Sequence, residues 1–285
     1  MRILVFGKTG QVATELARQA GVVNLGRDQA DLSDPDACAA IIRETDADAV
    51  INAAAYTNVD GAEGEEELAT LINGTAPAAM AKAAAKRGLP FLHISSDYVF
   101  NGQGARPWQP DDTPSPLGAY GRSKRVGEDG VRAAGGAYAI LRTSWVFSAH
   151  GANFVKTMLR LGKGRDTLDI VSDQIGGPTP AAGIAATLVT MAKAFHNGAG
   201  RSGIYHYSGI PTVSWADFAR QIFARSDMQV AVRNIPTSAY PTPAKRPLNS
   251  RLNASTLAAD YGIDPPDWKV GLNDVLKELG HLKND

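Results

Sequence analysis

The chain has 285 residues and carries 29 basic (Lys plus Arg) and 29 acidic (Asp plus Glu) side chains. A chain without net charge lacks the basic surface that nucleic acids require, so we expect no nucleic-acid partner. Cys38 is its one cysteine, which rules out an internal disulfide and favours a reduced, cytoplasmic setting. No apolar run approaches the roughly 18 residues of a membrane helix, and the histidines lack metal-ligand spacing. We therefore expect neither a membrane partner nor a bound metal.

The first half of the chain alternates predicted strands and helices. The predicted strands are apolar runs at residues 2–6, 21–25, 49–55, 90–95 and 137–145. Helical patterns separate them at 11–20, 33–44, 65–73, 76–87 and around Tyr120, with Ser33 expected as the N-cap of the second helix. Uniformly apolar strands joined by helices indicate a parallel sheet covered on both faces. The predicted fold is therefore an α/β doubly wound parallel sheet of the Rossmann type.

The pattern changes after about residue 150. Helices are predicted at 153–164, 179–195 and 214–226, a short strand at 203–209, and a proline-rich, substrate-facing loop at 236–251. We interpret residues 1–150 as the dinucleotide-binding domain, completed by elements from about 175–200. Residues 151–285 are expected to form mainly a smaller C-terminal α/β region that binds the substrate.

A glycine turn joins the first predicted strand to the first helix. Gly7 and Gly10 are spaced as G-x-x-G rather than G-x-G-x-x-G, and Gln11 and Val12 open the helix. A backbone without Cβ atoms lets a pyrophosphate approach the N-terminus of that helix. The turn therefore predicts nucleotide binding by these four residues.

Further candidate residues follow the other predicted strands. Because ligands bind at the carboxyl ends of parallel strands, we expect these residues to lie near one site. The expected cofactor contacts are Asp31 and the Leu32 backbone, beside the adenine, and Ala55, Tyr56 and Thr57 after the third strand. Ser96 and Asp97 end the fourth strand.

Tyr120 and Lys124 are four residues apart in a predicted helix. Positions i and i+4 share one face, so the ammonium can approach the ring and lower the pKa of the phenol. The bare spacing is equally typical of a solvated helix. Together with Ser96 it suits carbonyl reduction, in which Ser96 polarises the carbonyl, a nicotinamide gives hydride and Tyr120 gives the proton.

Several motifs resemble one known family. They are "GKTGQVA", "NAAAYTNVD", "SSDYVFNG", "SPLGAYGRSK", "LRTSWVF", "NFVKTMLRL", "VSDQIGGPT" and "YPTPAKRPLNSRL". The sequence resembles, nearly end to end, the extended short-chain dehydrogenase/reductases and, among them, the dTDP-4-dehydrorhamnose reductases. The resemblance implies NAD(P)H-dependent reduction of the 4-keto group of dTDP-4-dehydro-L-rhamnose to dTDP-L-rhamnose, the last step of dTDP-rhamnose synthesis.

The resemblance also implies residue roles. Tyr120 would be the proton donor, Lys124 its partner and the ribose ligand, and Ser96 the carbonyl-orienting hydroxyl, where the family more often has Thr. Trp145 is similar to a sugar-contacting aromatic, although core packing is the alternative. The remaining implied substrate contacts are Asp97, Tyr120, Arg246, Asn249 and Arg251, of which the two arginines suit a diphosphate or are simply surface charges.

Other functions remain open at this stage. A 4,6-dehydratase would need an acid pair after the fourth strand, but Asp97 precedes Tyr98 and not Glu. A related nucleotide-sugar 4-ketoreductase, an epimerase or a non-catalytic regulatory module of the same fold are further alternatives. A homodimer is possible. Glu15 matches an acidic position of metal-bridged dimers in the family, but "PAAGIAA" offers no second carboxylate, so we do not expect a metal there.

The residues after the second predicted strand indicate the coenzyme. A carboxylate directly at that strand's end favours NAD, because it repels a 2′-phosphate. Here Gly26 and Arg27 come first and Asp28 only afterwards. We therefore expect NADPH as the preferred cofactor, bound in part by Arg27, with NADH also accepted.

Overall fold

The structure is a computed structural model that describes residues 1–283, and a six-stranded parallel sheet forms its centre. All neighbouring strands of this sheet pair in parallel. Their order is β10 (Gly203–His206), β5 (Tyr138–Thr143), β4 (Phe91–Ser96), β3 (Ala49–Asn52), β1 (Ile3–Phe6) and β2 (Val22–Leu25). The strand order therefore reverses at β1, which has β2 on one side and β3 on the other.

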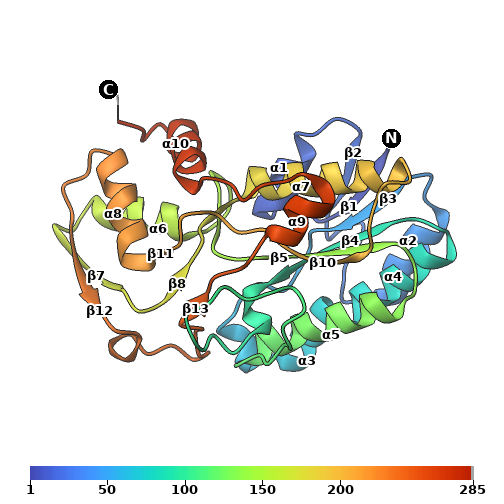
Figure 1. Cartoon of the computed structure of the whole chain (residues 1–285), viewed down its shortest axis with the longest axis horizontal. Coiled ribbons are helices and arrows are strands. Elements are labelled where there is room, and N and C mark those ends of the chain that lie inside the picture. Colours follow the sequence, from blue (N-terminus) through green and yellow to red (C-terminus); the bar gives the residue numbers. More distant parts are fainter. Residues whose placement is uncertain (284–285) are drawn as a thin grey trace.

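Helices cover both faces of this sheet (Figure 1). One face carries α1 (Gln11–Ala17), α7 (Ala181–His196) and α9 (Ser255–Tyr261), and the other carries α2 (Pro35–Glu44), α4 (Ala76–Lys86) and α5 (Ala119–Ala133). Successive side chains of a strand point to opposite faces. Accordingly Ile3 and Val5 enter one hydrophobic core while Leu4 and Phe6 enter the other. The predicted doubly wound α/β fold is confirmed.

Local details of two helices differ from the sequence prediction. Asp34, not Ser33, caps α2, because its carboxylate accepts the amide hydrogen of Ala37 at 3.0 Å. The helix predicted at 65–73 is α3 (Glu66–Thr70) followed by a π-helical turn, η2 (Leu71–Thr75), which runs into α4. Such π turns occur often at functional sites.

The C-terminal half builds a second region with its own core. Its helices are α6 (Phe154–Gly162), α8 (Trp215–Arg225) and α10 (Trp268–Glu278), packed around buried Phe218 and Trp268. Small sheets complete it, from β6 (Val146–Phe147), β7 (Thr167–Val171), β8 (Ile175–Gly176), β9 (Thr179–Pro180), β11 (Val213–Ser214), β12 (Ala231–Ile235) and β13 (Asn249–Ser250). Short 3₁₀ turns lie at η1 (Gly61–Glu63), η3 (Asp97–Val99) and η4 (Thr237–Ala239).

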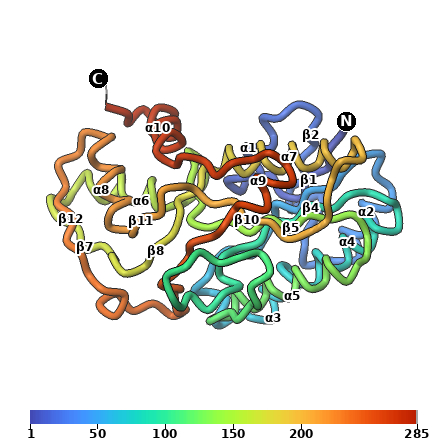
Figure 2. Tube along the Cα trace, viewed as in Figure 1, coloured from blue at the N-terminus to red at the C-terminus, as the bar shows by residue number. Residues whose placement is uncertain are grey.

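The chain passes between the two regions more than once, as the colours of Figure 2 show. After α6, β7 and β8, it returns to the central sheet through α7 and β10 before it builds α8. The sixth strand thus comes from residues 203–206, beyond the range 175–200 expected to complete the first domain. Within residues 1–283, no helix is both long and apolar enough to cross a membrane.

A buried ion pair fixes α5 on the sheet. Glu128 of α5 accepts hydrogen bonds of 2.6 and 2.8 Å from Arg142 of β5, and the two side chains are 2% and 1% exposed. The Arg142 guanidinium also lies over the Phe100 ring. Two charges out of water are stable only as a pair, so this contact fixes the position of the helix that carries Tyr120 and Lys124.

Glu128→Gln should lower the free energy of unfolding by about 3–5 kcal/mol, because it leaves a buried guanidinium without its counter-charge. Asp129→Asn is the matched control on the same helix: Asp129 is 57% exposed and pairs loosely with Arg125 and Arg132 at 3.7 Å. The control should stay within about 0.5 kcal/mol of the wild type. Urea denaturation measures both, and equal losses in the two variants would contradict a special role for the buried pair.

Candidate active site

A cavity of about 520 Å³ opens at the carboxyl edge of the central sheet. Its walls come from the segments that follow β1, β3, β4 and β5 and from the start of α5. It straddles the gap between β1 and β3, where the strand order reverses. Ligands of doubly wound sheets bind at this topological switch point.

The glycine turn forms one wall of this cavity. Gly7 has φ = +116°, and a Cβ there would lie 3.2 Å from the Ala53 backbone, so the chain itself requires glycine. Gly10 caps α1, and a Cβ there would meet no atom within 4 Å. The Gly10 side of the turn is therefore open at the start of α1, as the approach of a pyrophosphate to this end of the helix requires.

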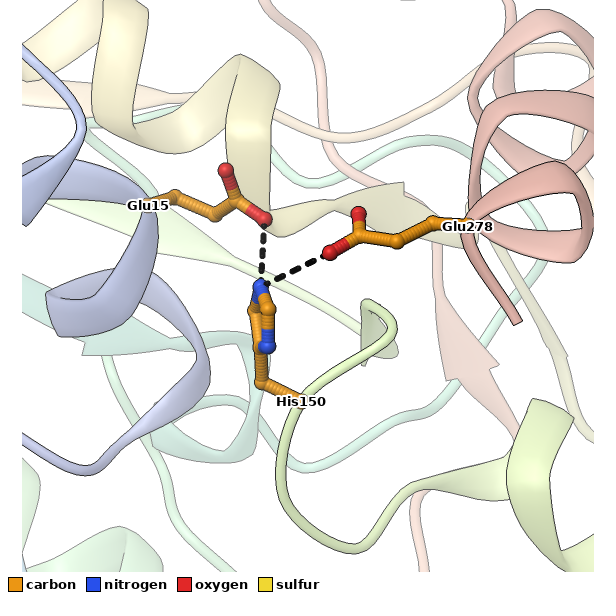
Figure 3. A group of neighbouring side chains, drawn as sticks. All are labelled: Glu15, His150 and Glu278. Carbon is orange, nitrogen blue, oxygen red and sulfur yellow. Dashed lines mark hydrogen bonds and ion pairs between the residues drawn. The ribbon is translucent and has the colours of Figure 1, made fainter.

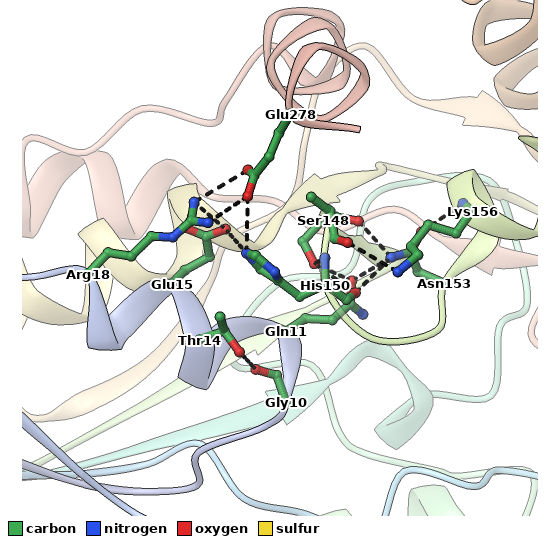
Figure 4. Close-up of polar contacts among 11 residues, drawn as sticks. Gly10, Gln11, Thr14, Glu15, Arg18, Ser148, His150, Asn153, Lys156 and Glu278 are labelled. Atoms are coloured by element: carbon green, nitrogen blue, oxygen red, sulfur yellow. Dashed lines mark hydrogen bonds and ion pairs between the residues drawn. The ribbon is translucent and has the colours of Figure 1, made fainter. Parts of the chain in front are cut away.

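The side-chain amide of Gln11 forms hydrogen bonds within the protein (Figure 4). Its Nε2 donates to the Val146 carbonyl at 3.4 Å, and its Oε1 accepts from Ser148 Oγ and Asn153 Nδ2 at 2.8 and 2.9 Å. Gln11 thus ties the glycine turn to the loop that enters the second region. Only its backbone and its cavity-facing surface remain for a cofactor.

Ser96 and Asp97 lie where β4 ends. The Ser96 hydroxyl donates to Asp97 Oδ1 at 2.9 Å and accepts the amide hydrogen of Tyr98 at 3.1 Å. Burial raises the pKa of Asp97 to about 6. Buried Ser95 Oγ, Asp97 Oδ2 and Thr143 Oγ1 have no partner among the described residues. Since buried polar atoms are normally hydrogen-bonded, these atoms point to a polar ligand at this end of the cavity.

The structure brings Tyr120 and Lys124 to the same cavity as Ser96. Burial raises the pKa of Tyr120 to about 12, an effect that the Asp97 charge strengthens and the Ser96 hydroxyl opposes. The expected lowering of this pKa by Lys124 is therefore not found. The reason is that the lysine amine turns to β4, where it donates to the Ile94 carbonyl at 2.7 Å. A phenol with a raised pKa stays protonated at neutral pH, which a proton donor requires.

A second cavity of about 700 Å³ lies mainly within the C-terminal region, with Asp60 and Tyr98 of the first half of the chain in its wall. Tyr98 lines both cavities, and its ring meets that of Tyr120 edge-on at 5.5 Å. Arg246 donates to Asp60 at 2.7 Å, while its buried Nη1 has no hydrogen-bond partner within residues 1–283 and so can bind an anionic ligand. The predicted substrate-facing loop contributes Ala239, Tyr240 and Thr242 to this wall.

Trp145 stands between the two cavities. It has φ = +49° and lines the first cavity, while its ring stacks at 3.5 Å on Trp215, which lines the second. A non-glycine residue in this backbone region is unusual and often marks a functional site. Trp145 is thus half-buried between the two cavities, which is compatible both with packing and with contact to a sugar.

Some predicted site residues lie apart from the lining of these cavities. Asn249 is 1% exposed; it donates to the Arg106 carbonyl and accepts from Arg251, so both side chains are engaged within the protein. The Tyr56 hydroxyl donates to Glu65 at 2.6 Å, away from the cavity that Ala55 and Thr57 line. Leu32 packs in the core and Asp31 accepts the Ser33 amide hydrogen. The Arg27 side chain is 79% exposed beyond β2.

The sequence analysis missed two buried polar residues beside the site. Asn73 lies on the π turn η2. Its side-chain oxygen accepts the amide hydrogen of Tyr56, and its NH₂ group donates to the Tyr56 carbonyl and to Ser123 Oγ, the latter at 3.0 Å. His93, on β4, lies 3.3 Å from the Lys124 amine. His93 could have been found as a polar side chain in the apolar run "PFLHIS". Asn73 could not, because no sequence pattern indicates a π turn.

A charged cluster lies outside both cavities, where α1, α10 and the loop before α6 meet. Potential ligand atoms of Glu15, His150 and Glu278 lie within 4.8 Å of one another (Figure 3). Arg18 already donates to Glu278 at 2.6 Å and to Glu15 at 3.4 Å (Figure 4). Because this guanidinium balances the carboxylates, a divalent cation would have to compete with it, and we assign no metal to the cluster.

The comparisons with known proteins agree with this geometry. The model of the RmlD substrate binding domain matches residues 1–281. A dTDP-4-dehydrorhamnose reductase of Burkholderia thailandensis is 43% identical and covers 98% of this chain and 99% of its own; that of Escherichia coli is 41% identical, with 98% of each covered.

Solved structures give the same result. A dTDP-4-dehydrorhamnose reductase of Clostridium acetobutylicum is 35% identical with a TM-score of 0.92 and covers 98% of this chain and all (100%) of its own. That of Bacillus anthracis, in complex with NADP, is 32% identical with a TM-score of 0.91 and covers 97% of this chain and 99% of its own. The chain therefore belongs to the dTDP-4-dehydrorhamnose reductase family.

Proposed function

We propose that this protein reduces the 4-keto group of dTDP-4-dehydro-L-rhamnose to the alcohol of dTDP-L-rhamnose, with NADPH as the preferred reductant and NADH as a usable one. The observation that carries the proposal is the convergence of the Ser96 hydroxyl, the Tyr120 phenol and the glycine turn on one cavity. Family membership supports the choice of substrate.

The site residues have separable tasks. Bound NADPH supplies a hydride for the keto carbon. Ser96 orients and polarises the keto oxygen by hydrogen bonding, and Tyr120 gives its phenolic proton to the same oxygen as negative charge develops there. Lys124 lies on α5, one turn after Tyr120. Its amine donates one hydrogen to the Ile94 carbonyl and has another to donate to the cofactor ribose.

The cavity walls fit a dinucleotide. The Gly10 side of the glycine turn is open, the Gly7 backbone packs against Ala53, and Ala54 and Ala55 continue the same wall with small side chains. Arg27, beyond the end of β2, is 79% exposed and lies 4.0 Å from Asp31, a pair that its guanidinium would exchange for the 2′-phosphate. The Asp31 side chain is 43% exposed and stays accessible to a cofactor, whereas Leu32 and Tyr56 can contribute only through their backbone or by local rearrangement.

The second cavity suits the nucleotide part of the substrate. The Arg246 guanidinium nitrogen without a partner among the described residues fits a diphosphate. The Trp145–Trp215 stack joins this cavity, which Trp215 lines, to the first one, which Trp145 and Tyr120 line. We assign this role to the C-terminal region of residues 151–285, apart from α7, β10 and α9, which complete the cofactor domain. A homodimer and a cytoplasmic location stay predictions.

An epimerase, another ketoreductase or a regulatory module would give different results in one assay. NADPH oxidation on addition of dTDP-4-dehydro-L-rhamnose, followed as loss of absorbance, separates reduction from epimerisation and from binding without turnover. Turnover restricted to a different keto sugar would move the assignment to another ketoreductase.

Tyr120→Phe should lower kcat by roughly 10²–10⁴, the usual contribution of a positioned acid, with little change in the Kd for NADPH. Tyr98→Phe is the matched variant, because it removes the neighbouring phenol of the same edge-on ring pair. Steady-state kinetics and coenzyme fluorescence measure these effects. A larger loss of kcat in Tyr98→Phe than in Tyr120→Phe would contradict the proposal, because it would indicate that Tyr98 and not Tyr120 donates the proton.

Arg27→Ala should raise the KM for NADPH by roughly tenfold, at the lower end of the about 1.5–3 kcal/mol of a hydrogen bond to a charged group, because an exposed side chain is screened by solvent. NADH, which lacks the 2′-phosphate, is the internal control and should be used equally well by both proteins. The ratio of kcat/KM for the two coenzymes is the measurement. An unchanged ratio would show that Arg27 does not contact the 2′-phosphate.

A further inference from the structure

Lys124 has a buried amine that pairs with no carboxylate of residues 1–283. The residue is 2% exposed, and its amine contacts the Ile94 carbonyl at 2.7 Å and His93 Nε2 at 3.3 Å. An ammonium in such a place is stable only if every neighbouring group accepts a hydrogen bond from it. The Ile94 carbonyl meets this condition. Whether His93 also does depends on whether its Nε2 is a hydrogen-bond acceptor or a donor.

His93 is held from its other side by Asn52. The ring is fully buried, and its Nδ1 lies 3.2 Å from Asn52 Nδ2. The carboxamide of Asn52 cannot turn over without loss, because its Oδ1 accepts the amide hydrogen of Ala54 at 3.2 Å. Asn52 therefore presents its NH₂ group, a donor, to His93.

The hydrogen-bonding capacity of imidazole then decides what Lys124 meets. A neutral imidazole has one acceptor and one donor nitrogen. If Nδ1 accepts from Asn52, Nε2 carries the hydrogen and directs it at Lys124. A neutral amine accepts this hydrogen with its lone pair, whereas an ammonium does not. The chain Ala54–Asn52–His93–Lys124–Ile94 is fully paired only when the lysine is uncharged.

Burial acts in the same direction. It lowers the pKa of Lys124 to about 8, against the attraction of Glu128, and it holds the pKa of His93 well below its usual value, so that this ring stays neutral. The lysine charge is thus lost as the pH rises through about 8.

The other ionisable groups on α5 and on the elements packed against it are mostly engaged elsewhere. Glu128 is paired with Arg142 of β5, Glu66 of α3 with Arg122, and Glu63 of η1 accepts the Ala119 amide hydrogen. The further groups are Tyr120, Arg125, Asp129 and Arg132 on α5, Asp97 and Tyr98 on η3, and Lys82 and Lys86 on α4. Among them Glu128 is the one that raises the pKa of Lys124.

We propose that His93 is a positioning residue for the reduction: with its tautomer fixed by Asn52, it holds the Lys124 amine against β4 and disfavours the ammonium form. The proposal rests on the proposed function, since it concerns the lysine behind Tyr120. His93 itself does not line the cavity. It acts through Lys124 and sets the pH above which the lysine charge is absent from the site.

The test replaces His93 and compares a second buried histidine of the same sheet. Gln at position 93 can turn its carboxamide oxygen to the ammonium and should stabilise it. His206→Gln is the control: His206 of β10 is also fully buried, but it contacts Arg142 and the Trp108 carbonyl instead of Lys124.

The alkaline limb of the kcat/KM profile for NADPH should lie near pH 8 in the wild type, because a neutral Lys124 amine donates a weaker hydrogen bond to the cofactor ribose than the ammonium does. In His93→Gln it should move up by about one to two pH units, the size expected for one hydrogen bond to a charged group. His206→Gln should keep the wild-type limb. An unshifted limb in folded His93→Gln, or an equal shift in the control, would overturn the proposal.

A second measurement needs neither turnover nor a substitution at position 93. In protein labelled with ¹⁵N-histidine, His93 is the non-titrating ring signal that persists in His206→Gln. At pH 9.5 its nitrogen shifts should show the hydrogen on Nε2; a hydrogen on Nδ1 would overturn the proposal. If the wild type reduced no dTDP-4-dehydro-L-rhamnose, the proposed function would fail, and this measurement would still decide the role of His93.

Discussion

The site depends on how α5 is held against the sheet, and near Tyr120 it is held by the hydrogen bond from the buried Lys124 amine to the Ile94 carbonyl of β4. This hydrogen bond sets the rotation of α5 and so the direction in which Tyr120, one turn earlier, faces the cavity. A buried amine tolerates little displacement, and two further contacts keep α5 in place. The Glu128–Arg142 pair lies further along the helix, and Asn73 of the π turn donates to Ser123. The catalytic helix is thus fixed by polar groups that are themselves out of solvent.

The two cavities divide the task between the halves of the chain. The cofactor side is built from the edge of the sheet, where backbone geometry at Gly7 and Gly10 provides the space. The substrate side is built from the loop at 236–251 and from helices of the second region, and it brings a free guanidinium nitrogen. Tyr98 belongs to both walls, so the reacting groups lie where a hydride donor on one side meets a keto group on the other.

The sequence predicts the fold well because uniformly apolar strands and intervening helices leave few arrangements other than a doubly wound sheet. It also predicts that Ser96, Tyr120 and Lys124 lie near one cavity, since the helix that carries Tyr120 and Lys124 follows the strand that ends at Ser96. It predicts less well what each polar side chain binds. Spacing places Lys124 beside Tyr120 but cannot show that Ile94 and His93 hold its amine. The same holds for Asn249. The sequence does not distinguish a buried asparagine that bonds to Arg106 and Arg251 from an asparagine that binds substrate. Such partners depend on long-range packing.

Isotope transfer tests the central claim most directly, namely that the two cavities bring a nicotinamide and the keto carbon of the sugar together. The wild-type protein is incubated with dTDP-4-dehydro-L-rhamnose and NADPH that carries deuterium at both C4 positions of the nicotinamide. The product, isolated by ion exchange, is examined by NMR and mass spectrometry. We predict one deuterium per sugar, located at C4. A product without deuterium, or with the label at another carbon, would contradict direct hydride transfer at this site.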